Sequence, residues 1–417
     1  MLQQVEGSRA VAAAIAACHP QVICAYPISP QTHIVEELSR VVKAGELVGC
    51  EYVNVESEFA AMSGVIGASA VGARSYTATS SQGLLYMVEA VYNASGMGLP
   101  IVMTVANRAI GAPINIWNDH SDSMALRDAG WIQLFAASNQ DAVDLHVQAF
   151  ALAEQLSVPV MVCMDGFVLT HAVEDVDLPS QEQVDAVLPP FRPIQVLDPD
   201  DPITIGAMVG PEAFTEVKFL EAHRQLRALD AVQEAAERYR DVVGRDTGGL
   251  TTSYRLDDAE VAVVALGSVL GAAADVVDDL RAAGVAVGTL GVTCFRPWPL
   301  DEIRDALSGV SRVIVLNRAF SVGSGSILGA DVRLSLAAEE TSVYDVVLGL
   351  GGRPVTRAVL RRLLDDVLDG QVSDSVLSFP DLDVDLVARE LDREGPDRPQ
   401  AVSRGELGAD EWGKAWT

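Results

Sequence analysis

Two glutamates precede a run of small and apolar residues. Glu56 and Glu58 are separated by one serine, and residues 59–73 after them are mostly Ala, Gly, Val, Ile and Ser. A helix of this composition is too apolar to lie in water, so a carboxylate at its start would be partly desolvated. Desolvation raises the carboxylate's pKa and lets it share a proton, whereas the helix dipole favours the charged form. The pair therefore indicates either proton-transfer chemistry or an ordinary charged helix terminus.

The segment 26–32 places one serine between two prolines. Proline fixes its own φ and restricts the residue before it, so Ser29 is expected on a stiff loop after a short strand. A hydroxyl held on a rigid loop is a good hydrogen-bond donor to a substrate. The alternative is a plain turn in which Ser29 is a local cap.

Three further segments carry polar groups. Arg108 follows the apolar run 101–106 and could bind a carboxylate or phosphate, or form an ordinary surface ion pair. Residues 119–122 place a histidine between carboxylates, as a loop brace or as a base or metal ligand. The N–H groups of segment 77–83, where a strand turns into a helix, could hold an anion. P-loop and dinucleotide fingerprints are missing, and the glycine-rich segment 323–326 is expected to be a turn.

These residues must be positioned by alternating strands and helices. Such alternation predicts an α/β fold with a parallel sheet, and sites in such sheets lie at the carboxyl ends of the strands. The loops at 26–31, 54–58, 79–83 and 106–122 should therefore meet at one edge. The expected strands are 22–25, 51–55, 74–79, 101–106 and 158–164, and the expected helices are 8–18, 32–44, 58–71, 83–94 and 142–156.

The second half of the chain predicts another α/β unit. Residues 176–200 are expected to form a connecting arm, 212–243 a long charged helix across the first domain, and 246–256 a polar linker. After them come expected strands at 261–266, 285–290, 312–316 and 343–348 and a helix at 270–283. The predicted domains are 1–245 and 257–368, followed by an acidic extended tail at 369–417.

Composition excludes several classes of partner. The 417 residues carry a net charge of −29, which disfavours binding to nucleic acid or to an anionic membrane. Lysine is rare beside arginine, which reflects either a GC-rich genome or a salt-adapted host. The five cysteines lack paired spacing, so an iron–sulfur cluster or structural zinc is not expected and buried free thiols are. With no secretory signal and no transmembrane run, we expect a cytoplasmic protein.

Taken together, the motifs resemble those of a known family. Their order and spacing are similar to the alpha subunit of 2-oxoacid:ferredoxin oxidoreductases, most closely the pyruvate enzymes, over about residues 5–365. The motifs are Tyr-Pro-Ile-Ser-Pro at 26–30, Val-Glu-Ser-Glu at 55–58, Thr-Ala-Thr-Ser-Ser-Gln-Gly-Leu at 77–84, Leu-Pro-Ile-Val-Met at 99–103, Asn-Arg-Ala at 107–109, Ala-Pro-Ile-Asn-Ile at 112–116, Asp-His-Ser-Asp at 119–122, Gly-Phe at 166–167 and Phe-Arg-Pro at 295–297.

The resemblance implies a fold, a cofactor and partners. The fold is a parallel-sheet thiamine-diphosphate-binding domain of the pyrimidine type, followed by a transketolase-C-like α/β domain. Thiamine diphosphate would be shared with a beta subunit that binds its diphosphate and Mg²⁺, and gamma- and delta-type subunits would carry the iron–sulfur clusters. The reaction would be oxidative decarboxylation of pyruvate with coenzyme A to acetyl-CoA, CO₂ and reduced ferredoxin or a similar acceptor.

The same resemblance implies roles for individual residues. Glu58, with Glu56 as second choice, would hydrogen-bond the aminopyrimidine ring and so promote loss of the cofactor's C2 proton. Arg108 matches the arginine that binds the substrate carboxylate. Ser29 matches a position that is usually threonine, near substrate and cofactor, and the missing methyl leaves a slightly larger pocket. Pro27 and Ile28 would contact the cofactor.

Two alternatives remain open. The first is the same chemistry on phenylglyoxylate, a branched-chain 2-oxoacid, 2-oxoglutarate or oxalate. Oxalate is disfavoured because a small dianion would call for extra cations, and Ser29 is neutral. The second is a non-catalytic scaffold subunit.

Overall fold

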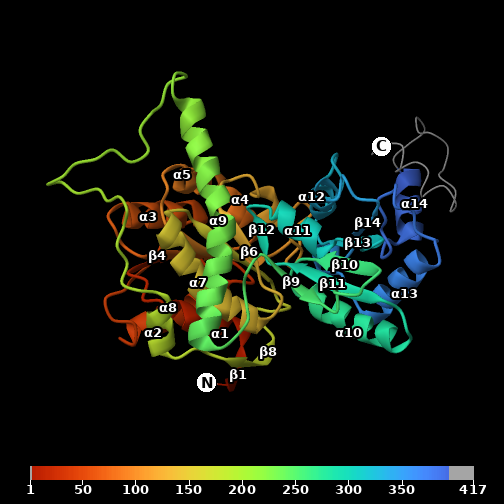
Figure 1. The fold of residues 1–417 in the computed structure, drawn as a ribbon. Helices are drawn as coiled ribbons and strands as arrows, with labels where there is room; N and C mark the ends of the chain where they lie inside the picture. The colour runs from red at the N-terminus through yellow and green to blue at the C-terminus, as the bar shows by residue number, and fades with distance from the viewer. Residues whose placement is uncertain (1, 394–417) are drawn as a thin grey trace. The chain divides into compact units, whose positions relative to one another are not determined.

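The computed structural model describes residues 2–393, which form two compact units (Figure 1). Within these residues, the first unit comprises 2–252 and 291–299, and the second comprises 253–290 and 300–393. The expected domain boundaries placed 291–299 in the second domain. Strand β12 (Cys294–Arg296) instead pairs antiparallel with β6 (Ile132–Phe135) of the first unit, which explains the difference.

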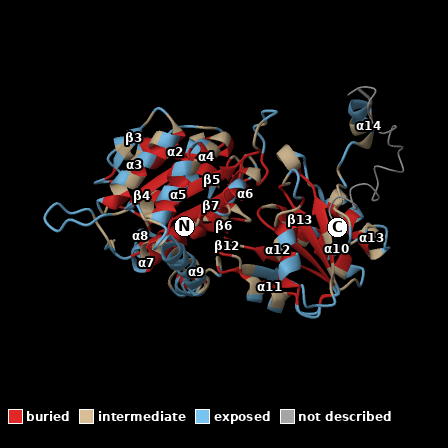
Figure 2. Ribbon diagram, turned by 90° about the horizontal axis from the view of Figure 1, so that it is seen from above, coloured by how far each residue is buried: buried red, intermediate tan, exposed pale blue. Residues whose placement is uncertain are grey.

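A seven-stranded sheet with strand order β12-β6-β7-β5-β4-β2-β3 forms the centre of the first unit. All neighbours except β12 and β6 run parallel. The strands β4, β5, β6 and β7 are buried along their length, as expected for a parallel sheet covered on both faces (Figure 2). The strands not yet given are β2 (Val22–Ala25), β3 (Glu51–Asn54), β4 (Ser75–Thr79), β5 (Ile101–Asn107) and β7 (Val160–Asp165).

Serine caps begin the helices that matter most for the site and the core. The Ser57 side chain accepts a hydrogen bond from the Ala60 N–H at 3.2 Å, and Ser138 accepts from the Asp141 N–H at 3.0 Å. These caps begin α3 (Glu58–Ala70) and α7 (Asn139–Leu156). The other helices around this sheet are α1 (Gly7–Ala17), α2 (Thr32–Lys43), α4 (Ser81–Tyr86), α5 (Val88–Gly96), α6 (Ser121–Ala125) and α8 (Gln181–Val187).

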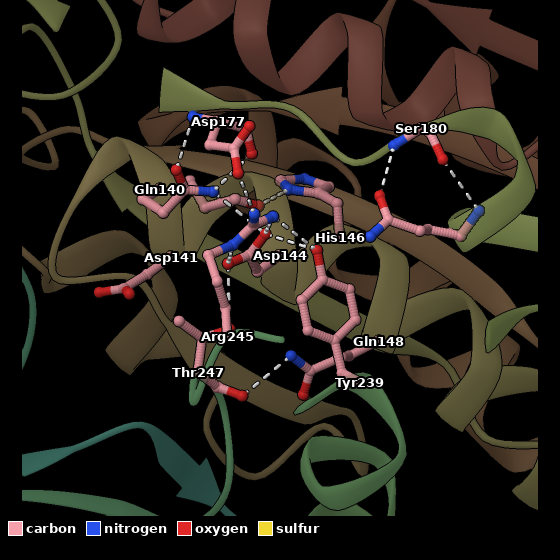
Figure 3. Close-up of polar contacts among 12 residues, drawn as sticks. Gln140, Asp141, Asp144, His146, Gln148, Asp177, Ser180, Tyr239, Arg245 and Thr247 are labelled. Atoms are coloured by element: carbon pink, nitrogen blue, oxygen red, sulfur yellow. Dashed lines mark hydrogen bonds and ion pairs between the residues drawn. The ribbon is translucent and has the colours of Figure 1, made fainter. Parts of the chain in front are cut away.

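The long helix α9 (Phe214–Val243) packs against α7, as expected for a helix across the first domain (Figure 1). Figure 3 shows the polar contacts that hold its C-terminal end. The buried Asp144 carboxylate accepts from the Tyr239 hydroxyl at 2.5 Å and from Arg245 Nη2 at 2.7 Å. Arg245 Nη1 also donates to Asp177 at 2.9 Å, and Thr247 donates to Asp144 at 3.0 Å. We call this group the α7–α9 clamp.

The second unit is built on a five-stranded sheet with strand order β14-β13-β10-β11-β9. Its apolar core lies between that sheet and helices α10 and α13. The strands are β9 (Thr251–Tyr254), β10 (Val261–Ala265), β11 (Val287–Val292), β13 (Arg312–Asn317) and β14 (Ser342–Val347), and the helices are α10 (Val269–Ala282), α11 (Leu300–Ala306), α12 (Leu328–Ser335), the 3₁₀ turn η1 (Leu350–Gly352), α13 (Arg357–Leu368) and α14 (Val384–Arg393).

The structure differs from the sequence-based expectation at several places besides β6 and β12, which were not predicted as strands. The helix expected at 83–94 is two helices, α4 and α5, which meet at Met87. The arm at 176–200 contains α8 and the end of β8 (Val173–Asp177), which pairs with β1 (Leu2–Glu6). The linker at 246–256 contains β9. The tail is helical over α14, and Ser378 bridges to β14; residues beyond 393 lie outside the described part.

The cysteines and the helices also bear on the expectations from composition. All five cysteines are buried free thiols, which confirms the prediction of buried thiols. Across residues 2–393, none of the helices combines the length and the apolar character that crossing a bilayer requires. In the same residues, no group of three or more His, Cys, Asp or Glu side chains is arranged to hold a metal ion.

Candidate active site

Burial distinguishes the two glutamates, between which the sequence alone did not decide. Glu58 is the first residue of α3 and is buried, whereas Glu56 is exposed. The difference has a local cause: Ser57 caps the helix, so the residue after it turns onto the packed side of the first turn. Glu58 is therefore the glutamate whose carboxylate is shielded from water.

The Glu58 carboxylate lies against the start of α4. A Cβ atom placed on Gly83 would be 2.7 Å from Glu58 Oε1 and 2.6 Å from Thr79 Oγ1, so only glycine fits there. The buried hydroxyls of Thr79 and Ser80 have no hydrogen-bond partner within the described residues. A buried carboxylate beside unpartnered hydroxyls fits the polar edge of a nitrogen heterocycle. Gly83 and Thr79 were quoted only as part of a motif, and their role was not predicted.

Arg108 follows β5 and is buried, so the surface ion pair considered as an alternative is not present. Its Nη1 donates to the Ser29 carbonyl oxygen at 2.6 Å, and its Nη2 donates to Gln82 Oε1 at 3.0 Å. Its Nε is buried and has no partner in the part of the chain that the structure describes. Burial lowers the pKa of Arg108, while the negative charges of Asp122 and Glu58 act to raise it. Because Gln82 directly precedes Gly83, against which Glu58 packs, both side chains contact the start of α4.

The loop 26–31 reaches the same site through its backbone. Buried Gln31 donates to the Tyr26 and Ala78 carbonyl oxygens at 2.9 and 3.3 Å, which fixes the loop beside β4. Ser29 is exposed, and its carbonyl rather than its hydroxyl makes the contact with Arg108. Of the other predicted cofactor contacts, Pro27 is exposed and Ile28 is partly buried.

The segment 119–122 acts as a brace. His120 Nε2 lies 2.7 Å from Asp165 Oδ1 at the end of β7, and both side chains are buried. Asp122 Oδ2 accepts from the Ser81 N–H at 2.9 Å. The expected anion-holding N–H at the start of α4 is thus already bonded to a carboxylate of the same chain. Gln82 and Asp122 are site residues that the sequence reasoning missed.

Comparison with known proteins identifies the family. Residues 13–240 match the model described as pyruvate flavodoxin/ferredoxin oxidoreductase, thiamine diP-bdg, and residues 259–359 match pyruvate:ferredoxin oxidoreductase core domain II. The chain belongs to the pyruvate:ferredoxin oxidoreductase family. This oxidoreductase subunit is 48% identical to pyruvate synthase subunit PorA of Methanosarcina barkeri over 367 residues, covering 87% of this chain and 91% of the relative. It is 37% identical to ketoisovalerate oxidoreductase subunit VorA of Pyrococcus abyssi, covering 87% and 92%.

Solved structures support the fold of this oxidoreductase subunit. A 2-oxoglutarate:ferredoxin oxidoreductase from Magnetococcus marinus gives a TM-score of 0.67 at 20% identity, over 88% of this chain and 65% of that one. A split-gene transketolase gives 0.53 at 14% identity, over 88% and 99%. The predicted α/β fold and the predicted family are both confirmed.

Proposed function

We propose that this subunit forms the aminopyrimidine half of a thiamine diphosphate site in an enzyme that oxidatively decarboxylates pyruvate. The products are acetyl-CoA, CO₂ and reduced ferredoxin, with coenzyme A as co-substrate. One observation carries the proposal: the buried Glu58 carboxylate packs on Gly83, and the buried guanidinium of Arg108 donates to Gln82, the residue before Gly83. The relatives named pyruvate synthase subunit PorA support pyruvate as the 2-oxoacid.

The side chains fit this assignment. Bound thiamine diphosphate supplies the carbanion for attack on the keto carbon and the electron sink for loss of CO₂. Glu58 holds a proton at the aminopyrimidine ring, where the low polarity around α3 strengthens that hydrogen bond. Arg108 binds the substrate carboxylate, for which its buried Nε is an available donor. Ser29, on the exposed loop with Pro27 and Ile28, contacts substrate and cofactor.

The other half of the site belongs to a partner in this proposal. A beta subunit binds the diphosphate and Mg²⁺, and gamma- and delta-type subunits hold the iron–sulfur clusters. Aromatic side chains near the site support this assignment, because Phe59, Tyr86 and Trp117 are 38%, 61% and 53% exposed in the isolated chain. Exposed aromatic groups of this size are typical of surfaces that another chain covers.

The two units take different roles. We assign residues 1–245 to the pyrimidine-type domain with its connecting arm and 257–368 to the transketolase-C-like domain, supported by the family matches over 13–240 and 259–359.

Because this chain carries a net charge of −29, an acidic ferredoxin docks on the cluster-bearing subunit and not on this chain. The buried thiols suit the reducing cytoplasm.

Turnover of the purified complex tests the function. Reduction of a low-potential viologen is measured with pyruvate, 2-oxoisovalerate and 2-oxoglutarate, each with and without coenzyme A and thiamine diphosphate. We expect pyruvate to give the highest kcat/KM and turnover to require thiamine diphosphate. A complex that turns over none of the acids contradicts the proposal and favours a scaffold role.

A branched-chain 2-oxoacid is the second candidate substrate. The 37% identity to the ketoisovalerate subunit supports it, and the family resemblance implies a slightly larger pocket where Ser29 stands in place of threonine. In the same assay, a higher kcat/KM for 2-oxoisovalerate than for pyruvate selects this candidate.

A further inference from the structure

One buried carboxylate joins the two loops that border the candidate site. Asp122 has no exposed surface, and its Oδ2 accepts hydrogen bonds from two backbone N–H groups, those of Ser81 at 2.9 Å and Arg108 at 3.0 Å. Its Oδ1 accepts from Asn107 Nδ2 and from the Ser123 N–H, both at 2.8 Å. Four N–H donors therefore surround the carboxylate, and its Oδ2 ties the chain after β4 to the chain after β5.

Of the two loops that Asp122 ties together, one carries Arg108 and the other contacts Glu58. Ser81 stands two residues before Gly83, against which the Glu58 carboxylate packs. The Ser81 hydroxyl also donates to the Ala109 carbonyl oxygen at 2.5 Å, so a second contact joins the same two loops. The φ of Ser81 is +49°, in the left-handed region that a residue other than glycine adopts only when its surroundings hold it there.

A neighbouring acid makes contacts of a different kind. Asp119, three residues earlier, accepts from the Ser121 N–H at 2.9 Å and from the Ser121 hydroxyl at 2.5 Å, within its own loop. His120 contacts Asp165 on β7. The contacts of Asp122, by contrast, run directly to the backbone of Arg108 and of the helix start that supports Glu58.

We propose that Asp122 is a positioning residue that sets the placement of Arg108 relative to Glu58 and thereby the affinity for the 2-oxoacid. The inference rests on the proposed function, in which Arg108 binds the substrate carboxylate. A carboxylate is needed because one oxygen accepts from two N–H groups while the other accepts two more. An amide of the same shape offers a single oxygen and turns its NH₂ group toward donors.

The first test is Asp122→Asn in the assembled complex. We expect the KM for pyruvate to rise about tenfold or more, because small displacements of a substrate-binding group are costly, while the Kd for thiamine diphosphate changes less than about threefold. Asp141→Asn is the matched control, since Asp141 accepts from the Ala137 N–H at the start of α7, away from these loops. An unchanged KM in Asp122→Asn overturns the proposal.

A double-mutant cycle separates positioning from general destabilisation. If Asp122 acts through Arg108, the effect of Asp122→Asn on KM disappears in an Arg108→Gln background; additive effects on KM contradict the proposal. If Asp122→Asn does not assemble, Asn107→Ala, which removes one donor to the Asp122 carboxylate, enters the same cycle with the same two outcomes. A wild-type complex without 2-oxoacid turnover refutes the proposed function itself, whereas normal wild-type turnover with additive variants refutes only the positioning role.

Discussion

Asp122 and Asp144 are both fully buried carboxylates of the first unit, yet their partners differ in kind. Asp144, in the α7–α9 clamp, forms a two-point ion pair with Arg245 and accepts from two hydroxyls, those of Tyr239 and Thr247 (Figure 3). Asp122 accepts from four uncharged N–H groups and forms no ion pair within the described residues. Burial raises the pKa of Asp122 to about 6, although these hydrogen bonds lower it.

The difference indicates what each carboxylate does. The charge of Asp144 is compensated by Arg245, so the clamp joins α7, β8 and the end of α9 as a stable unit. A buried charge held only by N–H groups is costly, and it persists where it fixes a backbone geometry that other groups depend on. We call Glu58, Arg108 and Asp122 together the catalytic edge, following the proposed function. Changes at the catalytic edge should therefore alter kinetics, and changes at the clamp should alter stability.

The largest effect is expected at the catalytic edge. Glu58→Gln removes the proton-holding group, so turnover of the complex should fall by roughly 10³-fold while the free energy of unfolding stays the same. Glu56→Gln is the control, because Glu56 is exposed two residues earlier and should keep full turnover. Steady-state kinetics and chemical denaturation of both variants measure the contrast. Equal losses in the two variants would remove the distinction between the glutamates.

The second effect belongs to the clamp. Asp144→Ala leaves the Arg245 guanidinium without its buried partner, which should lower the free energy of unfolding by about 3–5 kcal/mol. Because the clamp is on α7 and α9, the KM for the 2-oxoacid should not change in the folded protein. Urea denaturation and steady-state kinetics measure the two quantities. A raised KM would show that the clamp also supports the catalytic edge.

The sequence predicted most of the first sheet but not all of it. Strands β5 and β7 were predicted because they are mostly apolar, whereas the short inner strand β6 was not predicted. Strands β1 and β8 were missed because they are polar and are stabilised by pairing with each other across more than 160 residues of chain. β12 was missed because three residues carry no periodicity and only the partner strand β6 makes them a strand.

The site shows the same limit. Glu58 and Arg108 were predicted from local patterns and the family resemblance; both are buried and contact the start of α4, and their roles stay predictions. The choice between Glu56 and Glu58 depends on the position of the helix cap, which spacing alone does not fix. The role of Asp122 depends on its contact with Ser81, 41 residues away, and the role of Gly83 depends on packing against Glu58. Neither contact has a signal in the local sequence.

Acid should weaken the fold through His146, which lies on α7 two residues after the clamp residue Asp144 (Figure 3). Burial lowers the pKa of His146 to about 4 from 6.5. Between these values the unfolded chain binds a proton that the folded chain does not, so stability falls as the pH is lowered from 6.5 toward 4. The loss should reach about 3 kcal/mol.

Urea denaturation at several pH values measures this loss, with His146→Gln as the comparison. The glutamine variant should have a lower free energy of unfolding at pH 7, since His146 Nε2 lies 2.5 Å from Thr104 Oγ1. Its stability should depend less steeply on pH between 6.5 and 4. Equal slopes would mean that other groups cause the acid sensitivity.

The smallest expected effect tests whether a hydrogen bond to the buried Asp144 stabilises the fold more than a similar hydrogen bond to an exposed aspartate. Tyr239→Phe removes the hydroxyl that donates to Asp144 at 2.5 Å but keeps the ring, and should cost about 1.5–3 kcal/mol, as for other hydrogen bonds to a charged group. Tyr254→Phe is the matched control, because its hydroxyl donates to the exposed Asp278 at 2.9 Å in the second unit, where water replaces the lost contact. Chemical denaturation of both variants should give a clear loss for Tyr239 and almost none for Tyr254. Similar losses in free energy of unfolding would mean that burial does not strengthen the hydrogen bonds of the clamp. The contrast between the two buried aspartates would then be supported only by the kinetic effects at the catalytic edge.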